Sequence, residues 1–173
     1  MKSKFAFIFI LLICTNISLS AETQDYQKES DGFEWYRVRT DNWKNKGAKD
    51  KYGNVLVPIT YADVYYSHKD NIGYFLAYTS FQDGRKVAVY DKNGKIIIPL
   101  SRGYKGSVYC HNVYTGYEKS QDQPYWYFVI TDNETHTIVI CNLNGTEIFR
   151  SEGEYSRVTP HYDNGYFYSL VSR

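Results

Sequence analysis

Asp91-Lys-Asn-Gly-Lys-Ile-Ile-Ile-Pro99 joins a tight turn to a short strand, and this combination decides the fold. Asn93-Gly94 is the kind of pair that a two-residue hairpin turn needs, because both central residues adopt positive φ there. The isoleucines at 96–98 are β-branched and favour extended structure. Pro99 ends the strand because proline donates no ladder hydrogen bond. The segment therefore predicts a β-hairpin.

Similar segments occur twice more, as Asp50-Lys-Tyr-Gly-Asn-Val-Leu-Val-Pro58 and Asn142-Leu-Asn-Gly-Thr-Glu-Ile-Phe-Arg150. The turn glycines Gly53, Gly94 and Gly145 thus recur about every 40 to 50 residues, a period typical of stacked supersecondary units. Aromatic strands recur with them, at 32–38, 73–78, 125–130 and 165–171. We expect an all-β domain of about three repeated hairpin or meander units. These units are expected to form a short solenoid-like stack or a partly rolled antiparallel sheet, in which each unit covers its neighbour.

The expected organisation is a single β-repeat domain at 32–173. Its units are predicted at about 32–72, 73–124 and 125–164, with a partial fourth unit at 165–173. Residues 22–31 are polar and are expected to form a loose N-terminal arm, and residues 115–124 a surface loop. The aspartates Asp50 and Asp91 recur at equivalent positions before the turn glycines. This indicates a role in the turn, where such a side chain accepts hydrogen bonds from its own backbone.

Residues 1–21 have the pattern of a signal peptide. Lys2 and Lys4 precede an apolar run at 5–14, and small and polar residues follow as far as Ala21. A spanning helix needs roughly 20 apolar residues, about twice the length of this run. We expect cleavage after Ser20 or Ala21 and export to the periplasm, the cell surface or the medium. The membrane then serves only as the export route.

The charge balance and the aromatic content limit the classes of partner that the protein can bind. The net charge is +1, and it becomes about −1 once the two lysines of the signal are removed. This disfavours nucleic acid, which requires a concentrated basic surface. The 19 tyrosines have two interpretations, namely strand pairing or a binding face for glycan or protein. The candidate residues for such a face are Trp35, Tyr36, Tyr65, Tyr66, Tyr78 and Tyr127.

The cysteines and histidines are the remaining candidates for chemistry. Cys110 and Cys141 follow the signal, and an exported protein permits a disulfide between them. Two buried free thiols are nevertheless the default expectation, because cysteine packs as a small apolar side chain. None of the histidines has the spacing of a metal-binding pair, so no metal ion or cofactor is expected. Cys110 with a histidine from another unit is the one plausible nucleophile and base. A small secreted hydrolase or metal-dependent enzyme that uses these groups is therefore the alternative function.

The order of these features resembles the WG-repeat family, which is common in secreted bacterial proteins. The shared pattern is Asp-x-x-Gly-x-x-Ile-x-Pro, then Tyr-x-x-Val, then an aromatic strand and a hairpin. It covers about 32–171 and is clearest at 50–64 and 91–108. The resemblance implies a structural motif without catalytic residues. The leading expectation is a non-catalytic, exported binding or scaffolding module in the cell envelope or outside the cell, with protein or carbohydrate as its ligand.

Overall fold

The computed structural model describes residues 22–40, 42–113, 125–132, 134–151, 157–163 and 166–172. The predicted signal peptide at 1–21 and the predicted loop at 115–124 lie outside these residues. Within them, the chain consists of antiparallel β-sheets and a single 3-10 turn, η1 (Leu100–Arg102). None of the described residues forms a helix long and apolar enough to cross a bilayer.

Each sheet is built from strands that are consecutive in the chain. The first contains β1 (Glu22–Lys28), β2 (Glu34–Thr40), β3 (Lys46–Lys49) and β4 (Val55–Tyr61). The second contains β5 (Asp63–Lys69), β6 (Ile72–Tyr78), β7 (Val87–Asp91) and β8 (Ile96–Ile98). The third contains β9 (Ser107–Val113), β10 (Tyr125–Thr131), β11 (Ile138–Asn142) and β12 (Glu147–Arg150). The fourth is the pair β13 (Arg157–Asp163) and β14 (Tyr166–Ser172).

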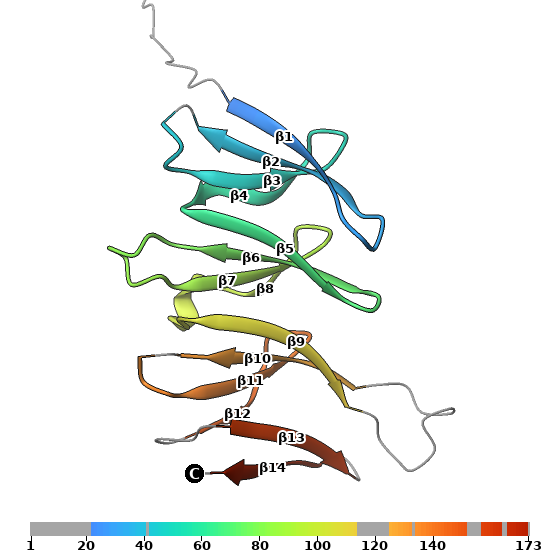
Figure 1. Cartoon of the computed structure of the whole chain (residues 1–173), viewed down its shortest axis with the longest axis vertical. Coiled ribbons are helices and arrows are strands. Elements are labelled where there is room, and N and C mark those ends of the chain that lie inside the picture. Colours follow the sequence, from blue (N-terminus) through green and yellow to red (C-terminus); the bar gives the residue numbers. More distant parts are fainter. Residues whose placement is uncertain are drawn as a thin grey trace, which may run out of the picture.

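The sheets follow one another in chain order along the longest axis of the molecule, with β1 near one end and β14 at the other (Figure 1). The strands run across this axis. The prediction of an all-β fold made of stacked, repeated antiparallel meanders is therefore confirmed.

Side chains alternate between the two faces of a strand, and both faces of the second sheet are buried. Phe75 packs toward the first sheet, where its ring centroid lies 5.2 Å from that of Trp35. Its neighbour Tyr74 packs toward the third sheet, 5.1 Å from Phe128. Each edge-to-face pair contributes about 0.5–1.5 kcal/mol beyond the burial of its area. This burial on both sides explains why β6 is almost continuously apolar instead of alternating with polar residues.

The three repeated turns have the same hydrogen bonds. In each, the glycine N–H donates to the carbonyl of the residue three positions earlier, at 3.1, 3.1 and 2.9 Å. The first side chain of each turn (Asp50, Asp91 or Asn142) accepts through Oδ1 from backbone N–H groups two and four residues later, at 2.8–3.0 Å. The predicted turn role of Asp50 and Asp91 is confirmed.

The turns differ from the expected two-residue type. Only the glycine adopts positive φ, at 88° for Gly53, 86° for Gly94 and 78° for Gly145, whereas Asn93 and Asn144 do not. Each turn is followed by a shift in strand register. The loop itself contains three residues and ends in the glycine at positive φ, as in the common three-residue hairpin, and the register shift lies further along the second strand. The residue between the two shifted pairs is Leu56, Ile97 or Ile148 in the successive sheets.

The prediction of a loose arm at 22–31 was wrong. β1 pairs with β2 along its whole length, from Glu22 opposite Thr40 to Lys28 opposite Glu34. Its polar composition suggested a loop, yet it suits an edge strand that is largely open to solvent. Each sheet consequently begins one strand earlier than the predicted units, at 22–61, 63–98 and 107–150, because a repeat period fixes the length of a unit but not its starting point.

Candidate functional site

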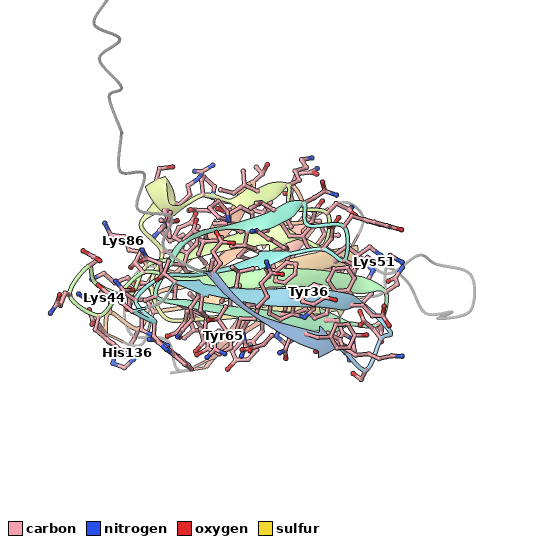
Figure 2. All side chains as sticks on the ribbon, turned by 90° about the horizontal axis from the view of Figure 1, so that it is seen from above. Tyr36, Lys44, Lys51, Tyr65, Lys86 and His136 are labelled. Atoms are coloured by element: carbon pink, nitrogen blue, oxygen red, sulfur yellow. The ribbon has the colours of Figure 1, made fainter. Side chains whose placement is uncertain are left out.

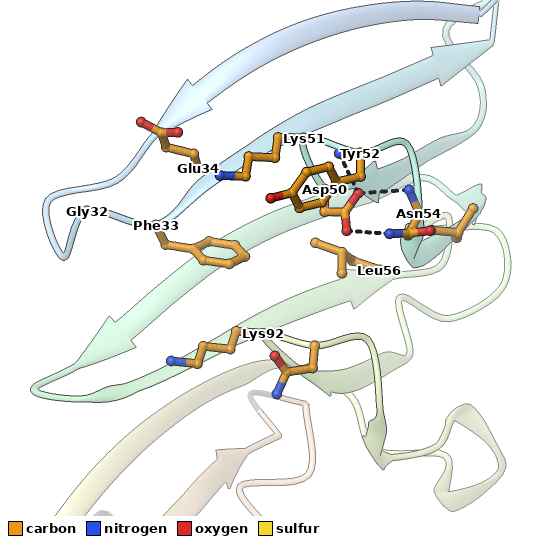
Figure 3. Close-up of a pocket in the computed structure, with 11 residues that line it drawn as sticks. Gly32, Phe33, Glu34, Asp50, Lys51, Tyr52, Asn54, Leu56 and Lys92 are labelled. Carbon is orange, nitrogen blue, oxygen red and sulfur yellow. Dashed lines mark hydrogen bonds between the residues drawn. The ribbon is translucent and has the colours of Figure 1, made fainter.

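A pocket in the described part of the chain lies beside the first repeated turn. It has a volume of about 470 Å³ and is bounded by the β1–β2 hairpin, the turn after β3 and the turn after β7 (Figure 3). We call it the turn pocket. Its lining residues are Gly32, Phe33, Glu34, Asp50, Lys51, Tyr52, Asn54, Val55, Leu56, Lys92 and Asn93.

The turn pocket combines aromatic, apolar and charged groups. Lys51 and Tyr52 stand on one side and Lys92 on the other, with Phe33 and Leu56 between them (Figure 3). Tyr52 is 78% exposed, so its ring is available to a ligand. Leu56 is buried and provides an apolar floor. A concave apolar surface with a few polar groups is the usual form of a binding site.

The turn that carries Tyr52 is held by its own hydrogen bonds. Besides two backbone N–H groups, the Asp50 carboxylate accepts a bond from the Asn54 side-chain amide at 2.7 Å. This side-chain bond and the backbone bonds lower the pKa of Asp50 below its usual value of 3.8. Asp50 therefore stays ionised at neutral pH and holds the turn. Because the backbone that carries Tyr52 is already fixed, binding at this ring requires no further ordering of the turn backbone.

An equivalent pocket occurs one sheet further along. It has a volume of about 190 Å³ and is likewise bounded by a hairpin between the first two strands, a repeated turn and the following turn. Its lining residues are Asn71, Ile72, Gly73, Asp91, Lys92, Asn93, Ile97 and Leu143. Lys92 and Asn93 belong to both pockets, so the two form a row along the stack.

Three of the six predicted aromatic binding residues belong to the core instead. Trp35 is 1% exposed, Tyr127 5% and Tyr78 8%. The Trp35 indole N–H donates to Glu29 at 2.6 Å, which satisfies its polar group. Buried rings cannot form a ligand surface, so the hypothesis that all six share one binding face was wrong. The strand interpretation of the abundant tyrosines applies to Tyr78 and Tyr127.

The other three predicted aromatic residues lie in separate places. Tyr36 lies over the middle of the first sheet when the stack is viewed along its axis (Figure 2). The Tyr66 hydroxyl donates to Asp31 at 2.7 Å, and its ring stacks on Phe33 at 4.8 Å. Tyr65 is 45% exposed and points to the opposite face from its neighbour, as alternation on a strand requires.

Cys110 and Cys141 are buried free thiols, as the default expectation held, and the possible disulfide between them does not form. Both lie opposite Phe128, one on each side, so that β10 separates them. Two strand spacings place their Cα atoms about 10 Å apart. A disulfide tolerates no more than about 7 Å.

The thiols are also poorly suited to nucleophilic chemistry. Burial raises the pKa of Cys110 to about 12 and raises that of Cys141 as well. The thiolate is the reactive form, so at neutral pH both groups are almost entirely inert. This geometry gives no support to the alternative of a hydrolase with a cysteine nucleophile.

The described histidine side chains do not assemble into a site. His68 Nε2 lies 2.8 Å from the Ser30 hydroxyl, and His136 occupies a turn with φ 55°. The His111 ring stacks on Tyr127 with centroids 5.9 Å apart, and burial lowers its pKa below 6.5. In the part of the chain that the structure describes, no three histidine, cysteine or acidic side chains gather closely enough to hold a metal ion. The side chain of His161 lies outside that part.

Sequence reasoning missed the turn pocket because it treated the repeated turns as purely structural. The residue before each turn glycine is Tyr52, Asn93 or Asn144, and this variation was the available signal for a surface position. Comparisons of the chain with protein-family models, with curated proteins and with solved structures found no match.

Proposed function

We propose that this protein is a non-catalytic, exported binding module whose row of turn pockets holds an elongated ligand, either a polypeptide segment or a glycan chain. The observation that carries the proposal is the exposed Tyr52 ring beside the turn pocket, on a turn fixed by its own hydrogen bonds. The resemblance to WG-repeat proteins supports the same function, and the signal-like sequence at 1–21 supports export to the periplasm, the cell surface or the medium.

An elongated ligand follows from the repetition of the pockets. Stacked sheets are spaced by about 10 Å, and an extended peptide advances about 3.3 Å per residue. A ligand whose chemistry repeats about every three residues, or a polysaccharide with a comparable period, can therefore meet the same surroundings at both pockets. Lys92 lies between them and can contact either segment of such a ligand.

The test is binding of the purified protein to a glycan array and to an array of extended synthetic peptides. Tyr52→Ala removes the exposed ring of the turn pocket. The matched control is Tyr109→Ala, because Tyr109 is a 57% exposed ring on β9 and does not line the turn pocket. We expect wild type and Tyr109→Ala to bind the same spots and Tyr52→Ala to lose them. Unchanged binding by Tyr52→Ala, or no bound spot on either array, would refute the proposal.

A further inference from the structure

Another pocket lies where the first two sheets meet, near the opposite end of the strands from the turn pocket. Lys44 is adjacent in sequence to a lining residue of this pocket, and Figure 2 shows it on the opposite side of the stack from Lys51 of the turn pocket. Its volume is about 220 Å³. We call it the basic pocket. Its lining residues are Arg37, Arg39, Trp43, Lys46, Asp63, Val64 and Tyr65.

Part of the positive charge in the basic pocket is neutralised by acidic side chains. The Arg39 guanidinium forms an ion pair with Asp25 and lies over the Trp43 ring, 3.8 Å from its centroid. Lys46 Nζ lies 2.5 Å from the Asp63 carboxylate, which Arg85 also approaches to 3.8 Å. Both acidic groups near the pocket are therefore already engaged with basic partners.

Arg37 is the basic group that remains. Its guanidinium lies 5.5 Å from the Trp35 ring centroid, and no carboxylate among the described residues pairs with it. The Nε atoms of Arg37 and Arg39 are both buried, and neither has a hydrogen-bond partner in the described part of the chain. A buried donor without a partner is costly, so both guanidinium groups retain hydrogen-bonding capacity that the described part of the protein does not use.

The second sheet shows which side chains suffice for stability at the positions that Arg37, Arg39 and Lys46 occupy in the first sheet. Arg37 lies opposite Ala48 and Arg39 opposite Lys46. The equivalent pairs in the second sheet are Leu76 with Val89 and Tyr78 with Val87. Leu76, Tyr78 and Val87 are thus the counterparts of Arg37, Arg39 and Lys46.

These counterparts are all buried in the core between the second and third sheets. An apolar trio is therefore sufficient for the stacking of two sheets at this position. Partial burial of three cations costs free energy that an apolar set avoids. Lys46 joins the two sheets through its ion pair with Asp63, and Arg39 pairs with Asp25, so Arg37 is the basic residue that neither stacking nor an ion pair explains.

We propose that the basic pocket binds an acidic sugar residue, with the Arg37 guanidinium on its carboxylate and the rings of Trp43 and Tyr65 beside the sugar ring. A planar guanidinium matches the two oxygens of a carboxylate. Trp43 is 63% and Tyr65 45% exposed, so both can contact a ring attached to that carboxylate. This site is separate from the turn pocket, and binding to it does not depend on the function proposed there.

The first test measures binding of oligogalacturonate by calorimetry, with the uncharged galactose oligomer as the ligand control. Arg37→Leu installs the residue found at the equivalent position 76. We expect it to weaken binding at least about tenfold and to leave the melting temperature unchanged or higher. Lys86→Leu is the matched control, since it removes one exposed positive charge at the same end of the molecule (Figure 2). It should bind like wild type, as should Tyr52→Ala.

The second test uses the unaltered protein, so it does not depend on the folding of a variant. The Nε–Hε NMR signals of Arg37 and Arg39 are followed while galacturonate, inorganic sulfate or poly-glutamate is added at fixed ionic strength. The proposal predicts shifts at lower concentrations of galacturonate than of the other two. A stronger response to poly-glutamate would indicate an acidic protein partner, and an equal response to sulfate would indicate a general anion site. Either result, no shift at all, or full binding by Arg37→Leu would overturn the assignment to an acidic sugar.

Discussion

Replacing the three turn glycines by alanine, one at a time, separates backbone strain from contact between sheets. Gly53, Gly94 and Gly145 occupy the same position in the same turn, with φ between 78° and 88°. A Cβ at positive φ costs roughly 1–2 kcal/mol per residue, and this part of the loss is common to all three variants. Any difference between them must come from the surroundings.

The surroundings differ because each later turn rests on the preceding sheet. A Cβ at Gly53 meets no atom within 4 Å. At Gly94 it would lie 3.0 Å from the Leu56 backbone, and at Gly145 only 1.9 Å from the Ile97 carbonyl oxygen. A backbone oxygen cannot rotate away, so the sheets must shift. Overpacking of this kind costs typically 1–3 kcal/mol more.

The expected losses are therefore about 1–2 kcal/mol for Gly53→Ala and about 2–5 kcal/mol for Gly145→Ala, with Gly94→Ala between them. At this chain length 1 kcal/mol corresponds to about 2–4 °C in melting temperature. Urea unfolding at 25 °C, followed by far-ultraviolet circular dichroism, gives the free energies directly. The order of the three losses in the free energy of unfolding tests whether contact with the preceding sheet adds to backbone strain. Equal losses, or the largest loss at Gly53, would show that contact between a turn and the sheet before it does not limit stability.

Three further results are expected. Cys110 and Cys141 should not react with iodoacetamide at pH 8 in the native protein, because both thiols are buried. In urea without a reductant both should be alkylated, whereas a disulfide-bonded pair would not react. The buried hydroxyl oxygens of Tyr61 and Tyr90 lie 2.6 Å apart. Tyr61→Phe should therefore lower the free energy of unfolding by about 1–2 kcal/mol, and replacing both tyrosines by phenylalanine should recover part of this loss. If the effects of the two single substitutions simply add in the double variant, the two hydroxyls are not coupled. The Arg150 guanidinium lowers the pKa of the Glu147 carboxyl below 4.5. The contribution of this carboxylate to stability is therefore present above pH 4.5 and is lost as the pH falls below that value. Glu147→Gln should flatten acid unfolding in that range, and parallel stability curves would contradict this.

The fold could be predicted largely from features that act locally. A glycine at positive φ and an acceptor side chain three residues before it define each repeated turn, whatever surrounds it. β1 could not be recognised in this way, because its polar residues pair with β2 only after the chain has turned back at 29–33. Its place in the fold depends on a neighbour and not on its own composition.

The binding residues required information that the linear sequence does not contain. Tyr65 and Tyr78 are both tyrosines in predicted strands, yet the Tyr65 side chain is 45% exposed and the Tyr78 side chain lies in the core. The basic character of Arg37 became informative only when the strand register made it equivalent to Leu76. An exposed and a buried ring have the same letter in the sequence, and only the stack of sheets distinguishes them.

The direction of the strands across the stack also determines how the molecule responds to tension. A pull along the long axis acts across the strands, so no ladder of hydrogen bonds bears the load in parallel (Figure 1). The core clusters that resist this pull are each formed between neighbouring sheets. Separation therefore proceeds one sheet at a time at low force, as in other one-dimensional arrays. The second sheet alone, about 36 residues long, would lengthen to roughly 120 Å when drawn out. A chain built in this way yields gradually, as an extensible tether does, and lengthens several-fold before any covalent bond is strained.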